Sequence, residues 1–181
     1  MYKKSEDLSR LRQWLLDEDY QSILDIVRMK KRILSLLTAL TYDKNQTISD
    51  HAIRATGLAA KVIAESDPEY IRNYLLRLFW LVNDESGGIG WRAPELIGEI
   101  LYNCPNFKQF FPILIALLDM EKEDAPRFRV GTLWAIGRVA QVANDAMQPA
   151  LPQVEILIDS EINPGTKEMA VWCMRQLISE N

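Results

Sequence analysis

Apolar residues recur along most of the chain at the three- and four-residue spacing of an amphipathic helix. The stretches 8–15, 33–40 and 71–82 each place leucine, isoleucine or valine side chains on one stripe. No stretch alternates apolar and polar residues between two turns, which is the pattern of a half-buried strand. The pattern therefore predicts an all-α protein. Trp14 and Trp80 lie on apolar faces of these helices, and we expect both to be core residues.

Helix start signals punctuate the pattern. Asp67 precedes Pro68, and Asn163 precedes Pro164, so each pair offers an N-cap followed by a proline that needs no N–H donor at the first helical position. The segment 47–50 (TISD) has the spacing of a capping box, with Asp in place of the usual Glu. These signals predict helix entrances at 67, at 163 and near 47.

The signals also repeat with a period of about 40 residues. Gly57, Gly98 and Gly137 lie in similar helical contexts and follow one another after 41 and 39 residues. A fourth stretch fits if Arg175 takes the place of the glycine. An apolar helix containing or ending in Asp precedes each of these stretches. The repeating unit is therefore a helix A, an Asp-containing turn and a helix B, and stacked units would share a continuous core.

Two segments carry a family resemblance, FFPILIALLDMEKEDAPRFRVGTLWAIGRVA and ALPQVEILIDSEINPGTKEMAVWCMRQL. They have a proline early in helix A (Pro112, Pro152), Asp at the turn and, in the first, Arg129 near the start of helix B. This pattern resembles HEAT repeats, particularly the short bacterial and archaeal PBS-lyase-HEAT-like kind. The chain departs from that pattern at Gly90 and Lys167, which occupy the position equivalent to Arg129 in their own repeats.

The resemblance implies an architecture for the whole chain. We expect one domain, 1–181, built as a right-handed α-solenoid. Residues 31–180 would form about four HEAT-like helix pairs, and residues 1–30 would form an N-terminal helical cap. Such a motif is specific for architecture and nearly silent on activity.

Composition narrows the classes of function. The 181 residues carry a net charge of −4, and we see no basic block of the kind that neutralises nucleic-acid phosphates. The longest apolar run has nine residues and contains Pro112, too short for a membrane span. No secretory signal follows the start, so we expect a cytoplasmic protein. His51 is the only histidine, and it lacks neighbours that would make a metal site, so we expect no metal or other cofactor.

The segment 87–93 (GGIGWRA) raises the question of a phosphate-binding loop. Gly88, Gly90 and Ala93 match the spacing of a dinucleotide-binding loop, but that motif requires a preceding strand, and a helix is predicted here. We favour a turn that needs glycine for its backbone geometry. A looser alternative stays open, an anion site at the helix start formed by Gly87, Gly88, Gly90 and Arg92.

Aligning the helical glycines predicts a binding face on the B helices. In HEAT-type repeats, the position three residues before this glycine is usually polar and faces the concave surface. Adding neighbours one turn away gives the expected concave residues, Trp91, Glu95, Glu99, Trp134, Arg138, Trp172 and Arg54. Glu95 and Glu99 share a face and could act as an acid–base or metal pair, but a solvated face is the simpler interpretation. Trp134 and Trp172 could instead be wedged between adjacent B helices.

These observations predict a non-enzymatic module that binds a protein or peptide on the concave B-helix face. The alternative is a binder of an anionic small molecule or prosthetic group, such as a tetrapyrrole, which the PBS-lyase-like resemblance implies. A third class, an enzyme acting on damaged bases, is disfavoured by the acidic balance. No nucleophile motif supports catalysis, and neither the partner nor the oligomeric state follows from the residues.

Overall fold

The computed structural model describes residues 2–83, 92–120 and 125–179. Throughout these ranges the elements are α-helices and short 3₁₀ turns, with no strand, which confirms the all-α prediction. The helices expected over 8–15, 33–40 and 71–82 are all present. None of the described helices combines the length and apolar character needed to cross a membrane.

The chain forms two compact units, Met1–Tyr74 and Leu75–Asn181, with the boundary inside one helix. Each unit is considered by itself, and the single domain 1–181 stays a prediction. The first unit contains α1 (Tyr2–Leu16), α2 (Tyr20–Met29), α3 (Ile33–Leu40), α4 (Gln46–Ser66) and the start of α5 (Pro68–Asn83). The second contains the rest of α5, then α6 (Ala93–Asn103), η1 (Lys108–Phe110), α7 (Phe111–Ala116), η2 (Leu117–Asp119), α8 (Ala125–Met147), η3 (Gln148–Ala150), α9 (Leu151–Ser160) and α10 (Pro164–Ile178).

In the first unit, α1, α2 and α3 pack on the long helix α4. The carbonyl oxygen of the Asn45 side chain caps α4 by accepting from the backbone N–H of Thr47 at 3.0 Å. The predicted capping box at 47–50 is therefore wrong. The asparagine two residues earlier already supplies the acceptor, so Thr47 lies inside the helix.

The two other predicted N-caps are confirmed. Asp67 accepts from the backbone N–H of Tyr70 at 3.1 Å, with Pro68 as the first residue of α5. Asn163 accepts from the backbone N–H of Thr166 at 3.0 Å at the start of α10. The carboxylate of Asp67 also binds the Lys31 ammonium at 2.6 Å. This hydrogen bond from Lys31, helped by that from Tyr70, holds the pKa of Asp67 below its usual value.

The lowered pKa of Asp67 predicts a pH-dependent difference between the wild-type protein and Asp67→Asn. Because the folded pKa lies below the unfolded value of about 3.9, the carboxylate stabilises the fold fully above that value and loses this effect as the pH falls through the folded pKa. Asparagine can still cap α5 but cannot pair with Lys31. The wild type should therefore melt at a higher temperature at pH 7, with the gap closing below about pH 4. A gap that stays constant with pH would contradict this account.

The expectation that the chain has no basic block is wrong at residues 28–32 (RMKKR). Each of the four basic side chains in this stretch lies near a carboxylate of the same unit. Arg28 pairs with Asp25, Lys31 with Asp67, and both Lys30 and Arg32 lie 3.8 Å from the buried Asp7. The stretch is thus largely neutralised within the fold.

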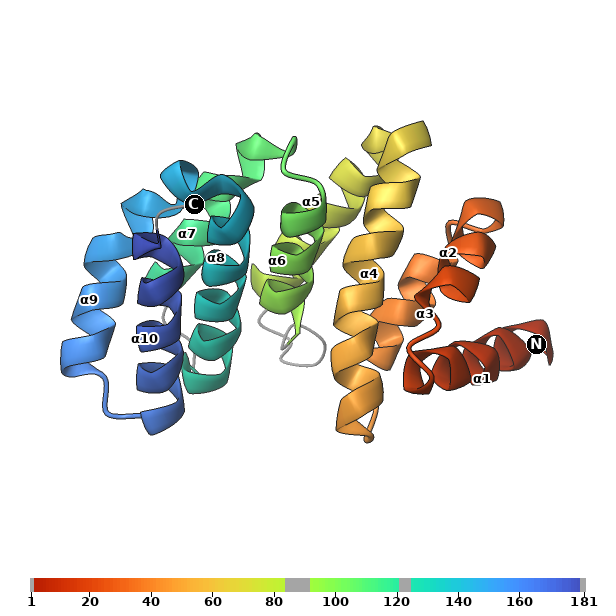
Figure 1. Cartoon of the computed structure of the whole chain (residues 1–181), viewed down its shortest axis with the longest axis horizontal. Coiled ribbons are helices and arrows are strands. Elements are labelled where there is room, and N and C mark those ends of the chain that lie inside the picture. Colours follow the sequence, from red (N-terminus) through yellow and green to blue (C-terminus); the bar gives the residue numbers. More distant parts are fainter. Residues whose placement is uncertain (1, 84–91, 121–124, 180–181) are drawn as a thin grey trace. The chain divides into compact units, whose positions relative to one another are not determined.

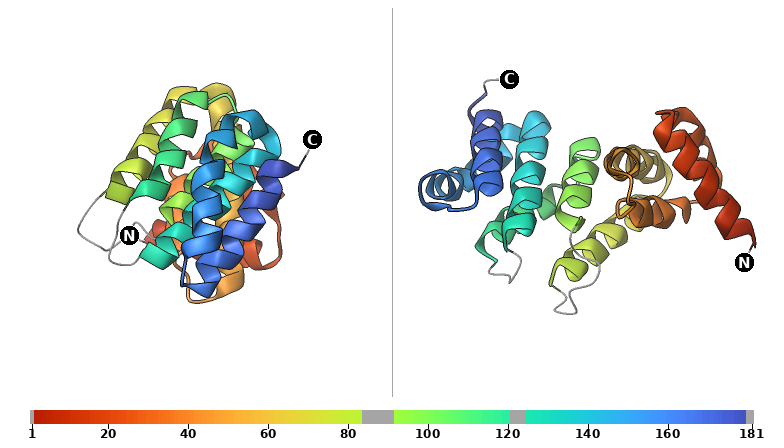
Figure 2. Two further views of the ribbon diagram at one scale, coloured as in Figure 1. Left: turned by 90° about the vertical axis from the view of Figure 1, so that its left-hand side faces the viewer. Right: turned by 90° about the horizontal axis from the view of Figure 1, so that it is seen from below.

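In the second unit, α6, α8 and α10 form one layer, with α8 between the other two (Figures 1 and 2). These are the B helices of the predicted repeats. Gly98 of α6 faces the backbone of Ala135 in α8 so closely that a Cβ at Gly98 would lie 2.6 Å from the Ala135 Cα. The helical glycine at this position therefore permits the close approach of two helices.

We expect Gly98→Ala to destabilise the protein by about 1–3 kcal/mol, because one helix would have to move away from the other. Gly165→Ala is the matched control. A Cβ there would meet only the Asn163 side chain at an ordinary 3.4 Å, so the helix propensity of alanine should leave stability equal or slightly improved. Thermal unfolding of both variants checks the prediction, and equal melting temperatures would show that α6 and α8 pack less closely.

The expectation that Trp80 is a core residue is wrong. Its side chain is 63 % exposed, and Leu76, one turn earlier on α5, is 42 % exposed. The buried stripe of α5 in the second unit contains Leu75, Leu78, Phe79 and Val82. Trp80 follows Phe79 directly, and the 100° step per residue carries it off that stripe. Trp14 is half-buried.

Candidate functional site

Two predicted face residues, Glu99 of α6 and Arg138 of α8, form an ion pair. The Arg138 Nε donates to Glu99 Oε2 at 2.9 Å, and its Nη2 donates to Oε1 at 3.2 Å. The Glu99 side chain is 4 % exposed and that of Arg138 is 24 % exposed. The two residues that the glycine alignment put on successive B helices therefore pair between α6 and α8, and Glu99 is buried beneath the arginine.

Arg138 is held on other sides as well. Its Nη1 donates to Gln141 Oε1 at 2.7 Å, and its guanidinium carbon lies 3.3 Å from the centre of the Tyr102 ring. Burial alone would lower the pKa of Arg138, but the hydrogen bonds and charge of Glu99, with Tyr102, outweigh it and raise that pKa. The side chain is therefore a fixed, permanently charged group.

The network continues onto α10. The Gln141 Nε2 donates to Gln176 Oε1 at 3.0 Å. We call Glu99, Arg138, Gln141 and Gln176 the polar row, since they cross α6, α8 and α10 in one connected chain of hydrogen bonds. Gln141, Gln176 and Tyr102 were not among the predicted face residues. Tyr102 lies three residues after Glu99, Gln141 three after Arg138, and Gln176 four after Trp172, and this helical spacing could have found them.

Glu95, one turn before Glu99, also lies in a tight setting. Its Oε1 accepts from Arg92 Nη1 at 3.2 Å, and its side chain is 13 % exposed. A Cβ on Gly131 of α8 would lie 2.6 Å from Glu95 Oε2. Gly131, which lies outside the glycine alignment, therefore makes room for this carboxylate.

The predicted anion site cannot be assembled as a whole. Gly87, Gly88, Gly90 and the predicted face residue Trp91 lie outside the described residues. Arg92 lies directly before α6 and pairs with Glu95. Because the Glu95 carboxylate already forms an ion pair with Arg92, the geometry gives the anion site no support and the site stays a prediction.

Of the two described face tryptophans, Trp172 has a specific packing partner. Its indole lies against Gly137 of α8, where a Cβ would be 3.1 Å from two ring carbons and still closer to a third. Trp172 and Trp134 are both half-buried. Trp172 therefore occupies space between α8 and α10, which fits the wedge interpretation, while part of its surface stays accessible.

Arg54, the remaining predicted face residue, belongs to the first unit. It is exposed on α4, and its guanidinium carbon lies 5.2 Å from the centre of the Tyr20 ring. The same tyrosine meets His51 edge to face at 6.3 Å between centroids. His51 Nδ1 lies 2.7 Å from the Leu15 carbonyl oxygen, so the histidine ties α4 to the end of α1.

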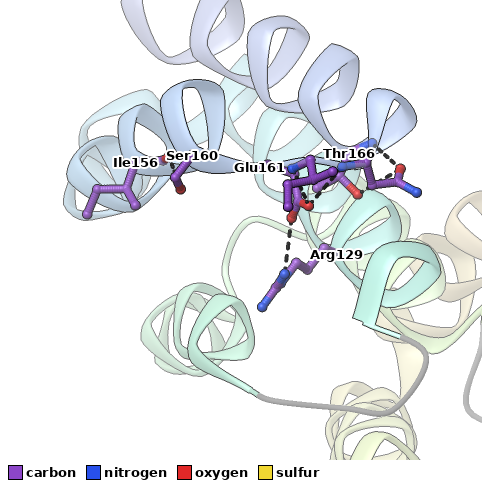
Figure 3. A network of polar contacts seen from close by, with 7 residues as sticks. Arg129, Ile156, Ser160, Glu161 and Thr166 are labelled. Carbon is purple, nitrogen blue, oxygen red and sulfur yellow. Dashed lines mark hydrogen bonds and ion pairs between the residues drawn. The ribbon is translucent and has the colours of Figure 1, made fainter.

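A second polar network fixes the turn between α9 and α10 (Figure 3). Arg129 Nη1 of α8 donates to Glu161 Oε2 at 3.1 Å, and Glu161 Oε1 accepts from the backbone N–H groups of Ile162 and Asn163. The bond from Asn163 is the main cause of the lowered pKa of Glu161. Arg129, singled out by the repeat pattern, thus anchors the following helix pair to α8.

Groups suited to catalysis do not converge in the part of the chain that the structure describes. No cluster of three His, Cys, Asp or Glu residues there could hold a metal ion. Both cysteines are buried and neither forms a disulfide, and burial raises the pKa of Cys173 to about 12. A thiol with this pKa is protonated at neutral pH and is a poor nucleophile.

Comparison with known proteins adds one relative. No model of a protein family matches the chain. An uncharacterized protein of Archaeoglobus fulgidus is 40 % identical over 79 residues, which are 43 % of this chain and 41 % of that protein. The chain thus matches about two fifths of the length of this relative, whose name describes no activity. The HEAT-repeat resemblance accordingly stays a prediction from the pattern of residues.

Proposed function

We propose that the protein is a non-enzymatic module of HEAT-like helix pairs that binds a protein or peptide on its B-helix face. In this proposal α3–α4, α5–α6, α7–α8 and α9–α10 are the four pairs of a right-handed α-solenoid, and α1 and α2 form the cap. The layer formed by α6, α8 and α10 and the packing of α7 on α8 and of α9 on α10 support it.

One observation carries the functional part of the proposal. The polar row crosses three successive B helices, and Trp134 and Trp172 lie one turn before two of its members, Arg138 and Gln176, on α8 and α10. Tryptophan and arginine are enriched among the residues that dominate binding energy at protein interfaces. A rigid arginine loses little further side-chain entropy when it binds, and this favours recognition. A ligand site at Arg92 has no comparable support, because its guanidinium pairs with Glu95.

Site-specific photo-crosslinking in the producing cells tests the proposal. A photoreactive benzoylphenylalanine in place of Trp134 should trap a discrete partner, identified by mass spectrometry. The same residue in place of Ile113, which is 43 % exposed on α7, serves as the control because it lies in a different helix layer. Adducts of equal yield at both positions, or none at position 134, would refute the B-helix face as the binding surface.

A further inference from the structure

We propose that the polar row recognises backbone carbonyl oxygens of an extended segment of the partner protein. This inference rests on the proposed function and names the chemistry that the B-helix face selects. The relevant property of the row is the direction of its hydrogen bonds, which leaves donors rather than acceptors for a partner.

Arg138 provides the first free donors. A guanidinium has five N–H bonds and no acceptor. Glu99 and Gln141 use three of them, and Tyr102 approaches the same group. At least one N–H is left for a ligand, and the side chain is 24 % exposed.

The orientation of the two glutamines follows from the arginine. Because Arg138 can only donate, Gln141 must present its oxygen to the arginine and its N–H₂ group to the next residue. Gln176 must then present its oxygen to Gln141. The N–H₂ group of Gln176 has no partner among the described residues, so the row ends in two unused donors on α10.

The electrostatics and spacing select the type of acceptor. Glu99 already neutralises the charge of Arg138, so the row offers hydrogen bonds without a net positive charge. Neutral carbonyl oxygens fit this better than phosphates or carboxylates, whose desolvation needs a compensating charge. Neighbouring helices lie about 8–10 Å apart, which equals about three residues of extended chain at about 3.3 Å each. An extended segment across α8 and α10 can therefore offer a carbonyl at both positions.

The test uses random linear peptides displayed on phage, selected against the full chain. Gln176→Glu is the diagnostic variant, because its carboxylate still accepts from Gln141 but replaces the free N–H₂ donors with an acceptor. Gln109→Glu is the matched control, since Gln109 is an exposed glutamine in η1 and the substitution adds the same charge away from the row. The melting temperatures of both variants verify that the fold is retained.

We expect a selected peptide to bind Gln176→Glu about tenfold or more weakly, and the control within about twofold of wild type. Affinity should change little between about 50 and 300 mM salt, because no net charge is recognised. Enrichment of acidic peptides with strongly salt-dependent affinity would overturn the inference in favour of carboxylate recognition. Equal binding by both variants, or no enriched linear peptide, would also overturn it.

The two proposals can fail separately. If crosslinking at position 134 traps a partner through a folded surface while no linear peptide is enriched, only the extended-segment inference is refuted. If position 134 traps nothing beyond the Ile113 control, the proposed function itself is refuted, whatever the peptides do.

Discussion

Arg138→Ala should lower the free energy of unfolding by about 3–5 kcal/mol, because it leaves the Glu99 carboxylate buried without its partner. The Glu99 side chain is 4 % exposed and receives two hydrogen bonds from Arg138. Denaturant unfolding measures the loss. Arg72→Ala is the control. Arg72 pairs with Glu69 on the exposed face of α5, with side chains 47 % and 64 % exposed, and its removal should cost at most about 1 kcal/mol.

A double variant separates the loss of the pair from the penalty of an isolated charge. Glu99→Leu with Arg138→Met replaces both charges by apolar groups of similar size, which is often neutral or stabilising at buried ion pairs. We therefore expect the double variant to be more stable than Arg138→Ala. A double variant at least as unstable as the single one would mean that Glu99 is hydrated or otherwise compensated in the folded protein.

The helical periodicity was sufficient to predict that the described residues are all-helical, whereas the helix pairs of the predicted repeats stay a proposal. The repeat spacing predicted Glu99 and Arg138 at equivalent positions of successive B helices, and in the structure they form an ion pair between α6 and α8. This worked because the register of a stacked helix layer follows from where small residues permit close approach, as at Gly98.

Burial and pairing were harder to predict, because a helical pattern gives the direction of a side chain and not its neighbours. Glu99 was expected on an open face, but an arginine 39 residues later covers it. Gly131 makes room for the Glu95 carboxylate, a contact between helices that no local signal reveals. Trp80 was expected in the core only because it is apolar among apolar neighbours, and the angular step from Phe79 decides otherwise.

Trp172→Ala should destabilise the protein by about 3–5 kcal/mol, because the indole fills the space over Gly137 and its removal leaves a cavity between α8 and α10. The half-buried Trp134 is the comparison on the same face. A small loss of stability for Trp134→Ala with a loss of partner crosslinking would mark it as a binding residue. A loss as large as that of Trp172→Ala would instead identify a second wedge.

Gly137→Ala shows whether the indole and the glycine meet in solution. In the wild-type background a Cβ at position 137 collides with the ring, and we expect a loss of about 1–3 kcal/mol. In the Trp172→Ala background the collision is absent, and alanine is the better helix former, so the same change should be neutral or stabilising. The two substitutions are therefore predicted to be strongly non-additive in denaturant unfolding. Additive losses would show that the indole does not rest on Gly137, and would return Trp172 to the set of residues available to a partner.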